Sequence, residues 1–417
     1  MKKLFVVALV FILALSMSGL AWANTAEVTQ EGNDNVVELT QAGSNFVEIG
    51  QDGDDNEATV VQDGVNELDI VQTGDNNGAE VSQSGENVAG VFQVGDENTA
   101  GITQVGYQNT ASIYQRGLAF LGRGLSDNNE ASITQDGDDN YAVIDQSAIG
   151  ALFAAGKSSE NTASVTQLGI SNDAVIGQDA TAILLSSAIA SGNDASVAQT
   201  GDNNSAIVLQ QALAALGEGY DVTSGNKAVV NQAGYDQEAN VLQFGAENKA
   251  TINQNWTYKV PGYGDNFAFV KQVGAENDVQ INQNRSFSEA RVVQLGDKNR
   301  TTVWQVSDYN KADVLQLGDK NRARVREQDG DYHKADVVQI GDQNYVDVKQ
   351  YIASNTATVY QYNNGRLNVG ANDFTNYATI LQTNGSGNVA NLIQLGDNTS
   401  YITQSGNDNN ARVFQNN

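Results

Sequence analysis

The chain has 417 residues, with 22 Lys or Arg against 50 Asp or Glu, so its formal net charge is −28. It contains no cysteine, one histidine and one proline. This composition excludes a disulfide framework, thiol chemistry and every catalytic or metal site that needs several histidines. We therefore expect a protein that is not an enzyme, with no cofactor, no metal and no nucleic-acid partner.

Residues 1–23 differ from the rest of the chain. Lys2 and Lys3 precede an apolar run from Leu4 to Leu20, and Ala21-Trp22-Ala23 follows. A basic start, an apolar stretch and a small-residue cleavage site are typical of a secretory signal peptide. The alternative, a membrane anchor, is less favoured because the apolar run is short. We predict a secreted mature protein without a membrane span.

From Asn24 onwards the chain repeats one seven-residue phrase, Asn-x-Ala-x-(Val/Ile)-x-Gln, in 31 copies. Most copies are joined by a four-residue turn of the form x-Gly-x-x, which gives a period of 11. A fixed period over a whole chain is the mark of a stacked array in which each unit covers its neighbour.

Restricted and variable positions alternate within the phrase. The last position is Gln in all copies except the one that ends at Glu327, and the first is Asn except at Gln237, Ser288 and His333. Positions 1, 3, 5 and 7 are restricted while 2, 4 and 6 vary, so each phrase is predicted to be a β-strand with one buried face. His333 is interpreted as a substitute for Asn rather than a catalytic group.

Insertions show how many strands make one layer. Four long ones, after Gln115, Gln146, Gln178 and Gln210, all follow odd-numbered copies, as a layer of two strands and about 22 residues predicts. The predicted fold is an all-β, parallel two-sheet β-solenoid over residues 24–417, with about 15.5 layers. The predicted insertions are 116–128, 147–160, 179–192, 211–225, 255–265 and 362–375.

The apolar insertions leave two interpretations open. They could pack on one another as a ridge, which we favour, or they could be loops that the solenoid merely tolerates. A packed ridge could serve as a lateral contact between fibres.

Stacking in parallel places each residue above its equivalent in the next layer, about 4.8 Å away. Asn over Asn and Gln over Gln would then form amide ladders, which satisfy donors and acceptors that are otherwise buried unpaired. Ala and Val or Ile would fill the interior between the two sheets. Representative positions are Asn98, Ala100, Ile102, Gln104, Asn109, Ala111, Ile113, Gln115, Asn299, Val303 and Gln305.

The first and last copies carry the full phrase, so neither looks like a polar cap. We predict that both are polymerisation ends, and that successive subunits are related by about a half turn because strands 1 and 31 belong to the same sheet. The predicted end residues are Asn24, Ala26, Val28 and Gln30, and Asn409, Ala411, Val413 and Gln415.

The segment Gln93-Val-Gly95-Asp-Glu-Asn98-Thr-Ala100-Gly-Ile102-Thr-Gln104 resembles the curlin repeat, the unit of bacterial curli subunits. The resemblance covers essentially the whole chain after residue 23. It implies a structural subunit of an extracellular amyloid fibre at the cell surface, which polymerises with itself in the biofilm matrix and mediates adhesion. It also implies a secretion channel, a nucleator and a periplasmic chaperone as partners. The chain has many more copies than the familiar curli subunits, and it lacks their Gly/Asn-rich segment before the repeats.

Two other functions remain open from the sequence. One is a minor, nucleating curli subunit. The other is a monomeric solenoid that binds a surface through calcium, since acidic turns such as 53–56 and 137–140 could hold this ion. Those turns lack the glycine spacing of calcium-binding β-rolls.

Overall fold

The computed structural model describes residues 11–14, 24–120, 123–151, 154–183, 187–215, 220–255, 265–363 and 376–416. Every regular element within these residues is a β-strand. Most of the predicted insertions 255–265 and 362–375, and of the predicted signal peptide, lie outside the described residues.

The chain divides into two compact units. Unit 1 comprises residues 1–203 and 207–225, and unit 2 comprises residues 204–206 and 226–417. The strands of unit 1, with β18 beginning in unit 2, are β1 (Phe11–Ala14), β2 (Thr25–Glu31), β3 (Val36–Gly43), β4 (Phe46–Asp52), β5 (Glu57–Gly64), β6 (Glu67–Thr73), β7 (Gly78–Val94), β8 (Thr99–Phe120), β9 (Arg123–Asp127), β10 (Glu130–Asp136), β11 (Tyr141–Asp145), β12 (Ala148–Ala151), β13 (Ala155–Ser159), β14 (Thr162–Leu168), β15 (Asp173–Ile183), β16 (Ser187–Ser191), β17 (Asp194–Asp202), β18 (Ser205–Ala215) and β19 (Tyr220–Ser224).

The strands of unit 2 are β20 (Lys227–Tyr235), β21 (Glu238–Phe244), β22 (Lys249–Asn255), β23 (Phe267–Val273), β24 (Asp278–Gln283), β25 (Glu289–Leu295), β26 (Arg300–Gln305), β27 (Lys311–Leu317), β28 (Arg322–Asp329), β29 (Lys334–Ile340), β30 (Asn344–Tyr351), β31 (Thr356–Tyr362), β32 (Asn376–Thr383), β33 (Val389–Leu395), β34 (Thr399–Ser405) and β35 (Asn410–Asn416).

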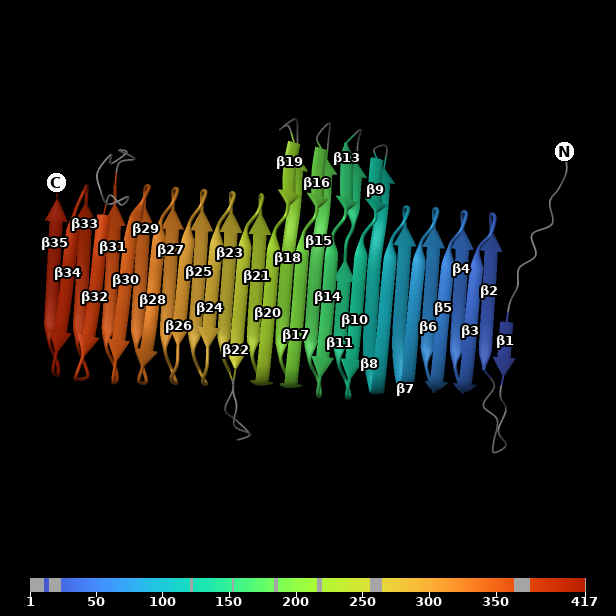
Figure 1. The fold of residues 1–417 in the computed structure, drawn as a ribbon, viewed down its shortest axis with the longest axis horizontal. Coiled ribbons are helices and arrows are strands. Elements are labelled where there is room, and N and C mark those ends of the chain that lie inside the picture. Colours follow the sequence, from blue (N-terminus) through green and yellow to red (C-terminus); the bar gives the residue numbers. More distant parts are fainter. Residues whose placement is uncertain are drawn as a thin grey trace. The chain divides into compact units, whose positions relative to one another are not determined.

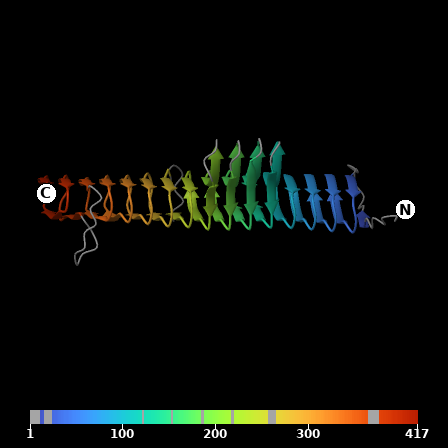
Figure 2. The ribbon, with the colours of Figure 1, turned by 90° about the horizontal axis from the view of Figure 1, so that it is seen from above.

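Each copy of the phrase pairs in parallel with the copy two places further along the chain. In unit 1, β2 pairs with β4 and β3 with β5, and in unit 2, β25 pairs with β27 and β26 with β28. Odd and even copies therefore form two stacks, which Figures 1 and 2 show within each unit. The predicted parallel β-solenoid is confirmed for each unit.

The register places identical residues of the phrase above one another. Gln30 pairs with Gln51 and Gln51 with Gln72, while Val28, Ile49 and Ile70 form the next inward column. Burial alternates along most strands, as in β10, where every second residue is buried. The Ala and Val or Ile columns form the core, and Ala100, Ile102, Ala111, Ile113 and Val303 are each at most 1% exposed.

One copy differs from its predicted alignment. The sequence places Glu327 at the Gln position, but Gln305 pairs with Gln328, and the register between β26 and β28 shifts there. Gln328 is fully buried. A β-bulge thus absorbs one extra residue and restores Gln to the inward column.

The turns have a backbone conformation that explains their glycine. Gly106 has a φ of +118°, and a Cβ added to it would lie 1.9 Å from the carbonyl oxygen of Gly137 in the next layer. A side chain is therefore excluded both by the backbone conformation and by the close stacking of the turns.

The insertions of unit 1 form additional strands rather than loops. β9, β13, β16 and β19 make a separate parallel sheet, opposite the extended ends of β8 and β15 and the short strand β12. Figure 1 shows these strands above the main stack of unit 1. The expectation of a packed ridge is confirmed for the described residues. Its interior consists of small residues, including Ala154, Ala180, Ala182, Ala188, Ala190 and Ala212.

β1 lies within the predicted signal peptide. It pairs in parallel with β3, and Ile12 is opposite Leu39. The edge of β3 that faces away from β5 therefore accepts a strand in the register of the solenoid.

Candidate functional site: amide ladders and terminal strands

The Gln column forms a continuous chain of hydrogen bonds over many layers. In unit 1, Gln83 Nε2 donates to Gln104 Oε1 (2.9 Å), and Gln104 Nε2 donates to Gln135 Oε1 (2.8 Å). Gln104 Nε2 also donates to the carbonyl oxygen of Val88 on the facing sheet (3.1 Å). Gln115 forms the same bonds to Gln146 and to the Thr99 carbonyl. Each of these Gln side chains thus links consecutive layers and joins the two sheets.

The Asn column runs in the opposite sense. Asn98 donates from its backbone N (3.1 Å) and from Nδ2 (3.2 Å) to Asn77 Oδ1, so each Asn donates to the preceding layer. Asn109 donates in the same way to Asn87 Oδ1, and its Nδ2 also reaches the carbonyl of Gly137 in the next turn (2.7 Å). The Asn side chain therefore fixes the start of the strand and the turn above it.

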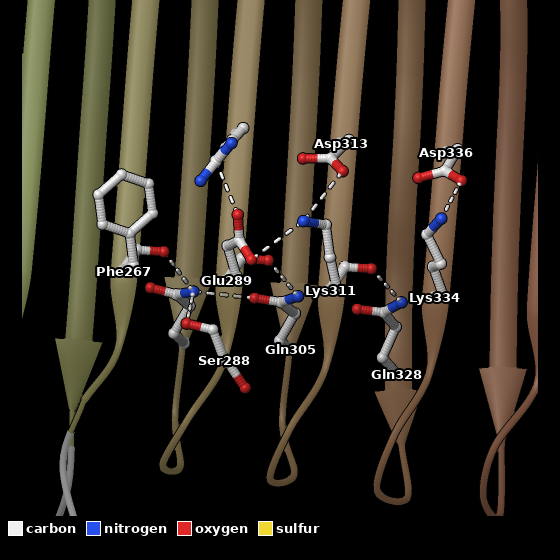
Figure 3. A network of polar contacts seen from close by, with 11 residues as sticks. Phe267, Ser288, Glu289, Gln305, Lys311, Asp313, Gln328, Lys334 and Asp336 are labelled. Atoms are coloured by element: carbon white, nitrogen blue, oxygen red, sulfur yellow. Dashed lines mark hydrogen bonds and ion pairs between the residues drawn. The ribbon is translucent and has the colours of Figure 1, made fainter.

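Unit 2 repeats this arrangement. Asn299 donates its backbone N–H to Asn277 Oδ1 (2.9 Å), and Nδ2 donates to the Gly318 carbonyl (2.7 Å). Gln305 accepts from Gln283 Nε2 (3.0 Å) and donates to the Glu289 carbonyl (3.0 Å). Figure 3 shows this part of the Gln column beside the charged residues on the outer face.

Several buried atoms without a partner lie where the phrase departs from its pattern, or in the layer next to such a departure. In the Asn column, Gln237 Oε1, His333 Nε2 and Asn266 Nδ2 have none among the described residues. At the bulge, Gln328 Oε1 also lacks a donor. Burying an unpaired polar atom costs free energy, so Asn and Gln at these positions are a structural requirement.

The acidic turns also have a role in the stack. Asp54 Oδ1 accepts the backbone N–H of Asn33 (2.8 Å), and Asp75 Oδ1 accepts that of Asp54 (2.8 Å). Each of these carboxylates therefore accepts a backbone N–H from the turn of the preceding layer. No group of three or more His, Asp or Glu suited to a metal ion occurs in the part of the chain that the structure describes.

The terminal strands expose positions that are buried elsewhere. In β2, Ala26 is exposed and Val28 is half-buried, and in β35, Ala411 and Val413 are half-buried. Asn24, Gln30 and Gln415 are also half-buried, and Asn409 is exposed.

The terminal strands also end the two ladders with opposite groups. Gln30 Nε2 donates to Gln51 Oε1 (2.6 Å), and no described residue donates to Gln30 Oε1. At β35, Gln415 Oε1 already accepts from Gln394 (2.9 Å), while Asn409 Nδ2 donates to Asn388 Oδ1 (2.9 Å) and leaves Asn409 Oδ1 as the last acceptor of its column. The Gln ladder thus ends with an acceptor at β2 and with a donor group at β35. The Asn ladder ends the other way round, with a donor group at β2 and an acceptor at β35.

Sequence reasoning located these strands and their inward residues, but it missed the direction of each ladder. That direction depends on the orientation of each amide group, for which one-letter patterns carry no signal.

No helix in the described part of the chain is long and apolar enough to cross a membrane. Among known families, the curlin associated repeat matches residues 86–117 and 127–151. A comparison with curated proteins found no match. The matched segments include Asn98–Gln104 and Asn109–Gln115, so the chain contains curlin associated repeats, and their inward residues recur in most of the described copies.

Proposed function

We propose that the protein is a structural subunit of a curli-like extracellular fibre and that it polymerises head to tail. The observation that carries this proposal is the complementarity of its terminal strands. The Gln acceptor and Asn donor at β2 match the Gln donor and Asn acceptor at β35. β34 ends its ladders in the same sense, because Gln404 Oε1 accepts from Gln382 and the Asn398 N–H donates to Asn376 Oδ1. A second copy that continues the stack would extend both ladders, whereas two identical ends would oppose donor to donor and acceptor to acceptor.

The edge of β3 supports the same conclusion. β1 occupies this edge in the structure, and removal of the predicted signal peptide would leave it open. An open edge of a flat parallel strand is a template for another chain. Secretion, adhesion and a role in a biofilm matrix are further parts of this proposal, and they rest on the predicted signal peptide and the family resemblance.

Incubation of the purified chain lacking residues 1–23 tests polymerisation directly. We expect fibres with a cross-β spacing of about 4.8 Å along their axis by fibre diffraction or cryo-electron microscopy. A chain that stays monodisperse would contradict the proposal and would favour the monomeric surface-binding alternative.

Paired cysteine substitutions test the direction of growth, because the natural chain has no cysteine. Thr29, Thr403 and Phe414 occupy the same outward position in β2, β34 and β35, and strands paired in parallel bring such positions within disulfide range. Thr29→Cys/Thr403→Cys should cross-link into covalent polymers if β2 stacks on β34, as the half-turn predicts. Thr29→Cys/Phe414→Cys should do so if subunits stack without rotation.

The single variants are the controls, and they should remain monomers on a denaturing gel. Covalent dimers of the single variant Thr29→Cys would show that identical ends meet, and would contradict head-to-tail growth.

A further inference from the structure

The outer face of the odd copies in unit 2 carries two adjacent apolar columns. β25, β27 and β29 place Val293, Leu315 and Val338 in one column, and Leu295, Leu317 and Ile340 in the next. All six side chains are partly exposed, on the opposite side of the strand from the buried Gln column. We call these two columns, which continue from β21 to β35 with Lys271 and Asn416 as interruptions, the apolar double column.

The other face of unit 2 differs at the equivalent positions. Asn231, Asn253 and Asn282 lie there in one outward column and donate to one another at 2.8 Å. The solenoid therefore does not require apolar residues at these outward positions. An extended apolar patch exposed to water is unfavourable for a monomer and marks a contact surface.

Charges beside the apolar double column neutralise one another within the face. Arg291 pairs with Glu289 (2.7 Å), Lys311 pairs with Glu289 (3.0 Å) and Asp313 (3.5 Å), and Lys334 pairs with Asp336 (2.8 Å). Figure 3 shows these pairs on three consecutive odd strands. On these three strands the three cations balance the three anions, and the outward positions of all odd strands from β21 to β35 carry four anions and five cations, on a chain whose formal net charge is −28.

We propose that this face of unit 2 binds the same face of a second copy of the chain, so that two stacks lie side by side. An apolar face with almost no net charge is where two strongly acidic copies can approach each other with the least repulsion. The whole outward face, with its charged and its apolar columns, spans eight strands, or about 38 Å along the stack. It extends about 23 Å along each strand, which gives an area of roughly 900 Å². Stable interfaces bury about 800 Å² per partner, so the area suffices.

Both copies repeat every layer at the same spacing, so apolar side chains can interdigitate along the whole face as they do between packed sheets. This contact is lateral, and it is independent of the head-to-tail growth proposed above.

The test replaces three residues of the first column, as Val293→Thr/Leu315→Thr/Val338→Thr. Threonine keeps the strand preference and removes apolar surface. The matched control, Asn253→Thr/Asn282→Thr/Trp304→Thr, changes three outward residues at the equivalent position of the opposite face. Circular dichroism establishes that both variants keep the β-structure of the natural chain.

Cryo-electron microscopy then gives the fraction of fibres that run in pairs, and sedimentation equilibrium gives the dimer fraction of chains that have not polymerised. We expect the apolar-face variant to weaken pairing by about tenfold or more, and the control to pair like the natural chain. Equal pairing in both variants would overturn the proposal, and so would a natural chain with unpaired fibres and no dimers. A natural chain that forms lateral dimers but no fibres would support this contact and contradict head-to-tail polymerisation.

A thiol cross-link gives a second measurement. It reports a gain of covalent dimer, which a loss of folding could not imitate. A short bifunctional thiol reagent should join two copies of Leu315→Cys, and it should leave Asn282→Cys unlinked. Equal linking at both positions would assign the contact to another surface or to another kind of partner.

Discussion

At the scale of single residues, amide side chains determine which sequences the solenoid accepts. Each Asn and Gln meets its equivalents above and below, so a residue of another shape disturbs two layers at once. Gln237 and His333 occupy the Asn column, and each leaves a buried atom without a partner. The inward Asn and Gln columns therefore tolerate few other residue types, even though the outward positions vary freely.

His333→Asn should stabilise unit 2. Burial lowers the pKa of His333, and its Nε2 has no partner among the described residues. The folded state therefore binds fewer protons than the unfolded state, so this residue makes stability fall as the pH drops below about 6.5. We expect the variant to be more stable than the natural chain at pH 5, with a smaller difference at pH 8, in denaturant unfolding. A larger gain at pH 8 would contradict this explanation.

Val303→Asp should destabilise the chain by several kcal/mol, because Val303 is fully buried and the carboxylate would have no partner. The control is Thr302→Asp, at the neighbouring position that is half-exposed on the outer face. We expect this change to cost within about 0.5 kcal/mol. Comparable losses in denaturant unfolding would show that the inward and outward faces have been assigned wrongly.

At the scale of elements, turns and insertions adapt one strand pattern to local constraints. Glycine at a turn is needed for its backbone conformation and for the approach of the next layer, whereas glycine at some outward strand positions meets no such constraint. Gly106 and Gly101 of β8 illustrate the two cases, because a Cβ on Gly101 would meet nothing within 4 Å.

Gly106→Ala should therefore cost about 1–3 kcal/mol or more, since it combines strain with a clash against Gly137. Gly101→Ala should be neutral or stabilise by up to about 1 kcal/mol, because it lowers the entropy of the unfolded chain. Denaturant unfolding of the two variants measures both effects. Similar stabilities would mean that the stacked turns can separate without cost.

The ridge of unit 1 contains a carboxyl group with an unusual environment. Burial, and then the charge of Asp145, raise the pKa of Asp179 to about 7, while bonds from Ser147 and Gln211 partly oppose this. The folded state thus binds a proton that the unfolded state has lost, so this residue lowers stability as the pH rises from about 4 to 7. Asp179→Asn should remove that loss, and unfolding at pH 5 and 7.5 checks it. If the variant and the natural chain have the same pH dependence of stability, the Asp179 carboxylate is in contact with water in the folded state, and this prediction is wrong.

Much of the fold could be predicted from the sequence, because period two and an 11-residue repeat directly encode strands and stacking. The bulge at Glu327 could not, since the seven-residue spacing from Asn321 places Glu327 in the last position, while the preference for Gln there favours Gln328. Only the cost of a buried carboxylate in the Gln column decides between them. The strands of the ridge were also missed, because Gly- and Ala-rich segments carry a weak strand signal until neighbouring layers align them.

At the scale of the whole molecule, charge is distributed unevenly along the chain. Residues 24–226 contain 30 acidic and 3 basic residues, a net of −27, and residues 227–417 contain 20 and 17, a net of −3. Together with Lys2 and Lys3 these values give the −28 of the full chain. Like charges already affect one another locally, since burial and then Glu48 and Glu67 raise the pKa of Asp69.

Salt should accelerate fibre growth, because it screens the repulsion between acidic segments over roughly 10 Å. The growth rate of preformed fibre seeds, measured at low and at physiological ionic strength, checks this. Sodium chloride and potassium chloride should act alike, since screening depends on ionic strength. A growth rate that is insensitive to salt would contradict the role of charge.

The parallel pairing has a mechanical consequence. Hydrogen bonds between layers point along the stack within each unit. Tension in that direction is therefore shared by all the bonds between two layers, and every successive pair of layers carries the same total force. A stack of this kind is as strong as its poorest layer. In unit 2 that layer includes β26 and β28, where the register shifts and Gln328 Oε1 has no donor. A pulling force should therefore open unit 2 first at this joint, and the bulge would act as its breaking point.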